Sequence, residues 1–144
     1  MASASMVVVD ASVWVARLVP QDVFHQAASK WMAAQRAENT LLLSPALLLP
    51  EVAGAVSRRT NDAELAGGAV AALERLPGLR LIEMERGLVA SAARLAGMLG
   101  LRGADAVYVA AAEYLNLPLC TLDDDQARRA AYKVQILFLS LLNP

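Results

Sequence analysis

Several residue types are scarce in this 144-residue chain, and each scarcity excludes a class of protein. Cys120 is the only cysteine and His25 the only histidine. An intrachain disulfide is therefore impossible, and no Ser–His or Cys–His arrangement for nucleophilic catalysis is visible. We expect Cys120 to be a small buried strand residue and His25 to lie at the surface or at an interface.

An excess of charge of one sign is also lacking, because the formal net charge is only -1. No overall basic field draws the chain toward nucleic acid, so any such binding must rest on local clusters. Eleven of the 13 basic residues are arginines, whose forked guanidinium suits phosphate.

Long hydrophobic runs are absent at both ends. The N-terminal MASASMVVVD lacks the basic segment and apolar core of a signal peptide. The late run VQILFLSLL is too short for a membrane span, which needs about 20 residues. We therefore expect a cytoplasmic protein with no membrane partner. The length and a hydrophobic content of 57% favour one domain over residues 1–144.

What the chain does have is a regular alternation of strand and helix patterns. Short apolar runs typical of buried parallel strands occur at 6–10, 41–44, 79–84 and 117–122, with 134–139 as a fifth strand or a docking segment. Helices are expected between them, at 11–18, 22–37, 45–59, 62–76, 86–99, 104–115 and 124–131. The alternation predicts an α/β fold, a three-layer α/β/α sandwich around a mostly parallel sheet of four to five strands.

Two helix boundaries carry specific signals. Ser44 and Pro45 are a good N-cap and first residue for the helix that should run to about Arg59. Pro50 lies within that helix and must kink it or reset its start. Gly100 is the expected end of the helix at 86–99.

Four acidic residues occupy positions where such a fold builds its site. Asp10 closes the first strand, Asp123 closes the fourth, and Asp105 lies in the first turn of a helix. Glu51 interrupts the apolar stretch ALLLPEVAGAV. Because strand ends and the helix starts that follow them share one edge of a parallel sheet, Asp10, Asp105 and Asp123 should converge there.

Each acid also has a purely structural explanation. Asp105 and Asp123 could answer the helix dipole, worth about 0.3–1 kcal/mol, and Asp123 with Gln126 resembles a capping box. Glu51 could point into solvent from an amphipathic helix. Asp10 is harder to explain in this way, because a buried strand end rarely holds a carboxylate without a partner.

Taken together, the four acids predict a cation. No lysine or histidine is placed in the sequence to neutralise them. Two carboxylates about 4 Å apart repel by roughly 4 kcal/mol at an effective dielectric of 20, so such a cluster must protonate or bind a metal. Oxygen ligands without His or Cys suit Mg²⁺ or Mn²⁺, and either ion supports phosphoryl chemistry.

Four stretches give the chain a resemblance to a known family: VVVDASVWV, PEVAGAV, LRGADAVYVAAAEYL and LCTLDDDQARRAA. Nearly the whole chain resembles the PIN domain, and more closely the VapC-type toxin ribonucleases. The resemblance implies a metal-dependent endoribonuclease that commonly dimerises and is blocked by a VapB-type antitoxin. It places the catalytic and metal-binding acids at Asp10, Glu51, Asp105 and Asp123, with Ser12 and Thr121 in supporting roles.

The chain departs from the family pattern in the last of these stretches. Gln126 stands where the family often has an apolar residue, and three acids follow one another at 123–125. Successive helical residues diverge by about 100°, so all three cannot face one ion. Asp123 is the expected ligand and Asp125 the second candidate.

The expected substrate is single-stranded or looped RNA, cleaved by water to leave a 5′-phosphate and a 3′-hydroxyl. The candidate phosphate contacts are Arg102, Arg128, Arg129 and Arg17, against the alternative that each lies on a solvated helix face. Trp14 could stack a base, although core packing is the stronger expectation.

Proteins with other functions also place acids at the strand ends of a parallel sheet. A phospho-acceptor receiver domain needs an aspartate at the third strand, where LIEM has none, and a dehalogenase-like phosphatase needs an acid where Ser12 stands. A nuclease that processes RNA without an antitoxin, or a PIN fold that only binds a partner, remains as an alternative.

Overall fold

Strands and helices alternate along the part of the chain that this computed structural model describes, residues 5–139. The elements in order are β1 (Met6–Val9), α1 (Ala11–Leu18), α2 (His25–Ala37), β2 (Leu41–Pro45), α3 (Leu48–Thr60), α4 (Ala63–Glu74), β3 (Leu79–Ile82), α5 (Arg86–Leu99), α6 (Gly103–Leu115), β4 (Leu119–Thr121), α7 (Asp124–Ala130) and β5 (Ile136–Phe138). The fifth strand, expected either as a strand or as a docking segment, is a strand.

All five strands form one parallel sheet in the order β3-β2-β1-β4-β5. The first strand of the chain is therefore the central one. In the register, Val8 lies opposite Leu43 of β2 and Leu119 of β4. The predicted α/β class and the parallel sheet are confirmed.

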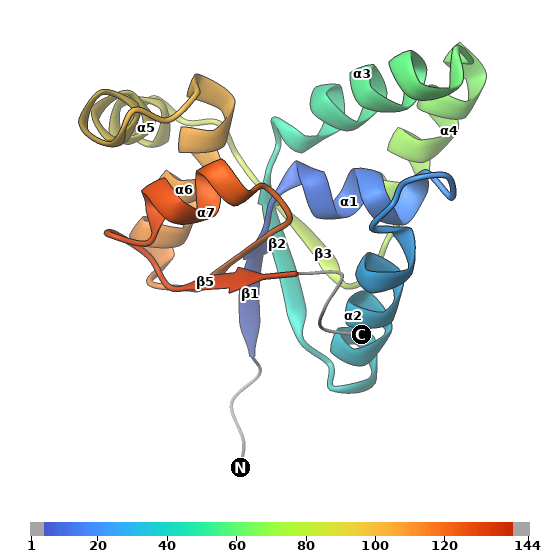
Figure 1. The fold of residues 1–144 in the computed structure, drawn as a ribbon, viewed down its shortest axis with the longest axis horizontal. Coiled ribbons are helices and arrows are strands. Elements are labelled where there is room, and N and C mark those ends of the chain that lie inside the picture. Colours follow the sequence, from blue (N-terminus) through green and yellow to red (C-terminus); the bar gives the residue numbers. More distant parts are fainter. Residues whose placement is uncertain (1–4, 140–144) are drawn as a thin grey trace.

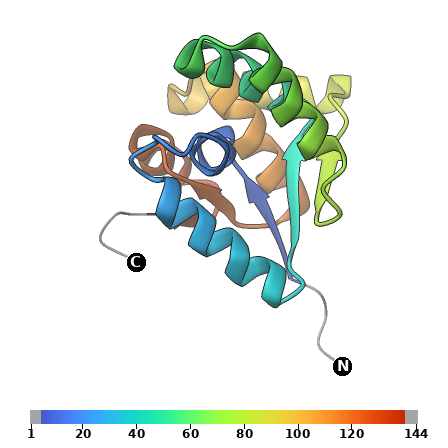
Figure 2. The ribbon, with the colours of Figure 1, turned by 90° about the vertical axis from the view of Figure 1, so that its right-hand side faces the viewer.

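Helices cover both faces of this sheet. The helices α1 to α4 lie on one side and α5 to α7 on the other (Figure 1). Figure 2 shows α1 end-on beside β1, with α2 running past it. Right-handed crossovers explain the division, because the chain moves outward from β1 to β3 and then returns across the sheet to β4.

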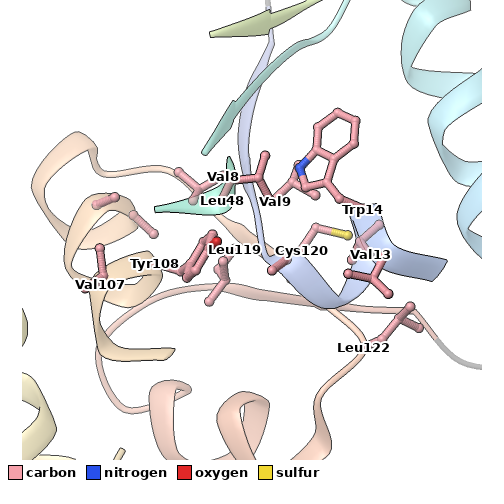
Figure 3. Packing of buried hydrophobic residues seen from close by; sticks show 14 of the residues in the cluster. Val8, Val9, Val13, Trp14, Leu48, Val107, Tyr108, Leu119, Cys120 and Leu122 are labelled. Atoms are coloured by element: carbon pink, nitrogen blue, oxygen red, sulfur yellow. The ribbon is translucent and has the colours of Figure 1, made fainter. Parts of the chain in front are cut away.

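The central strand is buried on both faces, as its continuous apolar sequence predicts. Val8 and Val9 have no exposed surface. Trp14 of α1 and Tyr108 of α6 lie on opposite sides of Val9, and both are almost fully buried (Figure 3). Trp14 is therefore a core residue, as expected, and its indole N–H donates to Ser44 Oγ at 3.0 Å.

The predicted start of the third helix is wrong. Ser44 and Pro45 end β2, and α3 begins at Leu48, which places Pro50 in its first turn. A first-turn proline sacrifices no helical hydrogen bond. Ser44 is instead held inside the molecule, where its hydroxyl donates to the carbonyl of Val9 at 2.6 Å.

The turn between α5 and α6 follows the predicted glycine signal. Gly100 ends α5 with φ +70°, and α6 begins at Gly103. The two helices meet at 112° and only as a pair reach the length and hydropathy of a membrane span; no single helix within residues 5–139 does so.

Candidate active site

The four predicted acids lie at the start of helices beside the central strands. Asp10 follows β1 and caps α1, and Asp123 follows β4 and caps α7. β1 and β4 are neighbours whose following helices leave toward opposite faces, which is the switch point where open parallel sheets place their sites. Asp105 lies in the first turn of α6 and Glu51 in that of α3.

Their charges act on one another across this edge. Burial raises the pKa of Asp10, which is 4% exposed, and the charge of Asp123 raises it further. Burial is also the main cause that raises the pKa of Glu51 and of Asp105, and the charge of Asp10 adds to both. The fold therefore brings acids from four separate stretches into one electrostatic cluster.

Asp10 is held in place from three sides. Its Oδ2 accepts from the backbone N–H of Ser12 at 3.0 Å, and the Thr121 hydroxyl lies 3.4 Å from the same oxygen. Its Oδ1 accepts from Gln126 Nε2 at 3.1 Å. Ser12 also accepts from the backbone N–H of Leu122 at 3.0 Å, which ties the two strand ends together. These contacts give Ser12 and Thr121 positions suited to a supporting role.

Gln126 is a site residue that the sequence interpretation missed. It is fully buried, and besides Asp10 its amide donates to the Asp105 carbonyl and accepts from Thr121 Oγ1 at 2.7 Å. The capping half of the capping-box prediction is confirmed, because Asp123 Oδ1 accepts from the Gln126 N–H at 2.9 Å. The return bond is missing because the glutamine side chain points to Asp10. The sequence signal that could have identified Gln126 was its departure from the family pattern.

Tyr108 is the second residue that was missed. Its hydroxyl donates to Glu51 Oε1 at 2.7 Å, and the ring is buried in the core (Figure 3). Burial and the neighbouring carboxylates raise the pKa of Tyr108, so it remains a donor. Its spacing of three residues from Asp105, one helical turn, could have placed it near the site.

An arginine supplies the counter-charge that no lysine or histidine provides. Arg102 donates from Nε to Asp105 Oδ2 at 3.0 Å and from Nη2 to Asp123 Oδ2 at 2.7 Å. Its side chain is 72% exposed, whereas those of Asp105 and Asp123 are 15% and 24% exposed. Arg102 therefore covers the acids from the solvent side.

The remaining candidates lie away from this centre. Arg128 pairs with Asp124 and Asp125, and Arg129 pairs with Asp125, all along the outer face of α7. Arg17 is exposed on α1 and lines a groove between α2 and α4.

Two residues set aside by the sequence reasoning lie where it expected them. Cys120 is buried in β4, and His25 lies at the partly exposed start of α2, with Nδ1 2.9 Å from the carbonyl of Ala16.

The donor set fits a hard divalent cation by its chemistry. The polar side chains that meet at this edge offer carboxylate, hydroxyl and amide oxygens, which are the ligands preferred by Mg²⁺ and Mn²⁺. Glu51 Oε2 and Asp105 Oδ1 accept no hydrogen bond within residues 5–139. Within residues 5–139, the structure shows no group of three or more acidic, His or Cys side chains arranged to hold a metal ion.

Comparisons with known proteins agree with this architecture. No curated protein sequence matches the chain. Among solved structures, the fold is similar to VapC20 of Mycobacterium tuberculosis, described as a sarcin-ricin loop cleaving toxin, with a TM-score of 0.74 and 20% identity over 85% of this chain and 93% of the other.

Two further solved structures are similar over nearly their full length. They are VapBC2 of Rickettsia felis bound to a promoter DNA fragment (TM-score 0.71, 14% identity, 94% of this chain and 99% of that chain) and FitAcB of Neisseria gonorrhoeae (TM-score 0.66, 21% identity, 92% and 96%). At these identities the likeness establishes the fold.

The family itself is established by the sequence model of the PIN domain, which matches residues 7–132. That range contains all four acids, Arg102 and Gln126. The chain therefore belongs to the PIN domain family.

Proposed function

We propose that the chain is a metal-dependent endoribonuclease that hydrolyses phosphodiester bonds in RNA, and that it is the toxin of a type II toxin–antitoxin pair. The observation that carries the proposal is the cluster of Asp10, Glu51, Asp105 and Asp123 at the switch point of a PIN fold. Three of these acids have a raised pKa because they are buried near one another, an electrostatic conflict that a cation relieves.

One or two Mg²⁺ or Mn²⁺ ions would be held by these four acids. When bound, such an ion lowers the pKa of water and stabilises charge on phosphoryl oxygens. The chain's own groups orient the ligands: Gln126 and Ser12 fix the two oxygens of Asp10, and Tyr108 fixes Oε1 of Glu51. Glu51 Oε2 is left to accept a proton from the attacking water, and its raised pKa makes it a better base.

No side chain needs to act as a nucleophile in this scheme. Burial raises the pKa of the Cys120 thiol, which keeps it protonated inside β4. In this proposal water attacks the phosphorus and the P–O3′ bond breaks, so the products carry a 5′-phosphate and a 3′-hydroxyl.

Binding of RNA would rest on Arg102 at the acidic edge and on exposed arginines farther from it. Arg102 is exposed at the start of α6, Arg128 is exposed in the last turn of α7, and Arg17 is exposed on α1. With a net charge of -1, these local cations must supply the attraction to phosphate.

The proposed partners are a VapB-type antitoxin and a second copy of the chain, and the proposed location is the cytoplasm. The support is the fold shared with VapC20, which is described as a toxin, and with a toxin–antitoxin complex from Klebsiella pneumoniae (TM-score 0.65, 15% identity, 96% of this chain and 98% of that chain). We also propose that residues 1–144 form a single domain.

The test is cleavage of a mixed RNA pool by the purified chain, freed of any antitoxin, with and without Mg²⁺. Glu51→Gln is the informative variant, because glutamine still accepts from Tyr108 through its Oε1 while losing the charge. Glu113→Gln is the matched control, since Glu113 pairs with Arg94 in another part of α6. Mg²⁺-dependent cuts by the wild type and the control but not by Glu51→Gln would support the proposal.

Two outcomes would count against it. Cleavage that persists in excess EDTA would remove the metal from the mechanism. Equal cleavage by Glu51→Gln and wild type would assign the activity to a contaminant or to another site.

A further inference from the structure

Arg102 occupies an unusual place for an active-site cation. It is the last residue before α6, with an extended backbone, and its carbonyl accepts from Ala106 N–H at 2.9 Å. The preceding Leu101 is buried and anchors the segment. The backbone of Arg102 is thus fixed at the start of α6, and its side chain extends to the start of α7.

The guanidinium uses oxygens that a metal would need. Asp123 Oδ1 caps the N-terminus of α7, where it accepts from Gln126 N–H. Its other oxygen, Oδ2, is held by Arg102 at 2.7 Å. Asp123 therefore has no unengaged oxygen while the arginine stays in place, and Asp105 has only Oδ1 left.

We propose that Arg102 is an internal counter-ion that occupies the cation position of this acidic site and leaves it when a divalent metal binds. The inference rests on the proposed function, because it concerns the same metal site. Once released, the guanidinium remains tethered at the rim of the site, where it can contact the phosphate of an RNA substrate. One residue thus serves the resting acids first and the substrate afterwards.

The free-energy cost of releasing Arg102 from the acids is small. Arg102 makes no side-chain hydrogen bond within the described part of the chain other than those to Asp105 and Asp123. Its side chain is largely in water, so solvent and salt weaken both ion pairs. A divalent ion offers the partly buried carboxylates of Asp105 and Asp123 a stronger charge than the exposed guanidinium does.

A rival interpretation is that Arg102 only fastens α6 to α7. The two interpretations predict opposite changes in metal affinity when Arg102 is removed. A structural fastener, once removed, loosens Asp105 and Asp123 and weakens metal affinity, whereas a competing counter-ion, once removed, strengthens it.

The experiment measures Mn²⁺ binding by electron paramagnetic resonance for the wild type, Arg102→Gln and Arg94→Gln. Arg94 is the matched control, an exposed arginine of α5 paired with Glu113. We expect Arg102→Gln to bind Mn²⁺ about three- to tenfold more tightly, the range for loss of two exposed ion pairs. Arg94→Gln should bind as the wild type does. Arg102→Lys, which keeps the charge but loses the fork, should lie between the wild type and Arg102→Gln.

A second readout separates the two roles of the arginine. In RNA cleavage at saturating Mn²⁺, the KM for RNA should rise in Arg102→Gln, although its metal affinity improves. Unchanged or weaker Mn²⁺ binding by Arg102→Gln would overturn the inference and leave the nuclease proposal standing. Failure of all these proteins to bind Mn²⁺ would overturn both.

Discussion

At the scale of single residues, Asp123 shows how one carboxylate can cap a helix and still present an oxygen to the acidic cluster. Its Oδ1 caps α7, and its Oδ2 faces Arg102 and the acidic cluster. The capping explanation and the metal explanation, which compete for the residue when only the sequence is considered, therefore apply to different oxygens. Asp124 and Asp125 pair instead with Arg128 and Arg129 on the outside of the helix.

This division predicts different results for three similar substitutions. Asp123→Asn keeps an oxygen for the cap but loses the charge, so RNA cleavage should fall by at least about a hundredfold, as for other preorganised charge-stabilising groups. Asp124→Asn and Asp125→Asn should leave cleavage nearly intact, because their partners are surface arginines. Initial rates with one RNA substrate at saturating Mg²⁺ provide the comparison. A loss in Asp125→Asn as large as that in Asp123→Asn would mean that a fifth carboxylate belongs to the site.

Gln126 gives a second prediction at this scale. Gln126→Leu restores the apolar residue typical of the family position but leaves Asp10 Oδ1 and the Thr121 hydroxyl without their buried partner. We expect the free energy of unfolding to fall by about 1–3 kcal/mol, the cost of unpaired buried polar groups, as measured by urea denaturation. Gln135→Leu, at an exposed position, is the control and should change stability little. Equal stability of the two variants would show that the Gln126 network adds nothing.

At the scale of elements, the local sequence signals predicted the structure correctly wherever residues close in the sequence satisfy them. The valine run of β1 is buried, and Gly100 ends α5. The signal at Ser44 failed because a distant tryptophan and the β1 backbone compete for its hydroxyl. A serine can cap a helix or bridge two layers, and only the tertiary packing decides between these roles.

The same distinction explains how much of the candidate site could be predicted. The acids could be found because strand ends and helix starts share an edge in any parallel sheet. Gln126, Tyr108 and the bridging position of Arg102 could not be derived in that way. Each depends on side-chain directions set by contacts with segments far away in the sequence.

The end of α5 supplies a prediction about an element. Gly100 has φ +70°, and an added Cβ would lie 2.7 Å from Arg129 Nη1. Gly100→Ala should therefore lower the free energy of unfolding by roughly 1–2 kcal/mol, mainly through backbone strain in the left-handed region. Gly97→Ala, inside the same helix with open space around it, should raise stability by up to about 1 kcal/mol. Thermal unfolding of both variants would check the opposite signs, and a stable Gly100→Ala would contradict the capping role.

At the scale of the whole molecule, the acid cluster makes stability depend on pH and metal together. The folded-state pKa values of Asp10, Glu51 and Asp105 are raised, so the folded protein binds more protons than the unfolded chain above their ordinary values of 3.8 and 4.5. Stability of the metal-free protein should consequently rise as the pH falls from neutral toward that range, and fall again as the pH increases.

Differential scanning calorimetry checks this coupling. Without metal, the Tm should be higher at pH 5.5 than at pH 7.5, other conditions being equal. Millimolar Mg²⁺ should raise the Tm at pH 7.5 and reduce the difference, because the ion binds the deprotonated acids. Glu51→Gln should raise the metal-free Tm at pH 7.5 and weaken the response to Mg²⁺. A Tm independent of pH and of Mg²⁺ would argue that the acids do not interact strongly.

The position of β1 at the centre of the sheet has a consequence for the timing of activity during synthesis. The strand that leaves the ribosome first must wait for β4 before its second edge is paired, and Thr121 lies 111 residues beyond Asp10. At about 5–20 residues per second, a nascent chain spends several seconds without a closed acidic edge. The proposed cleavage needs all four acids, so it cannot begin before Asp123 has been synthesised and β4 has joined the sheet.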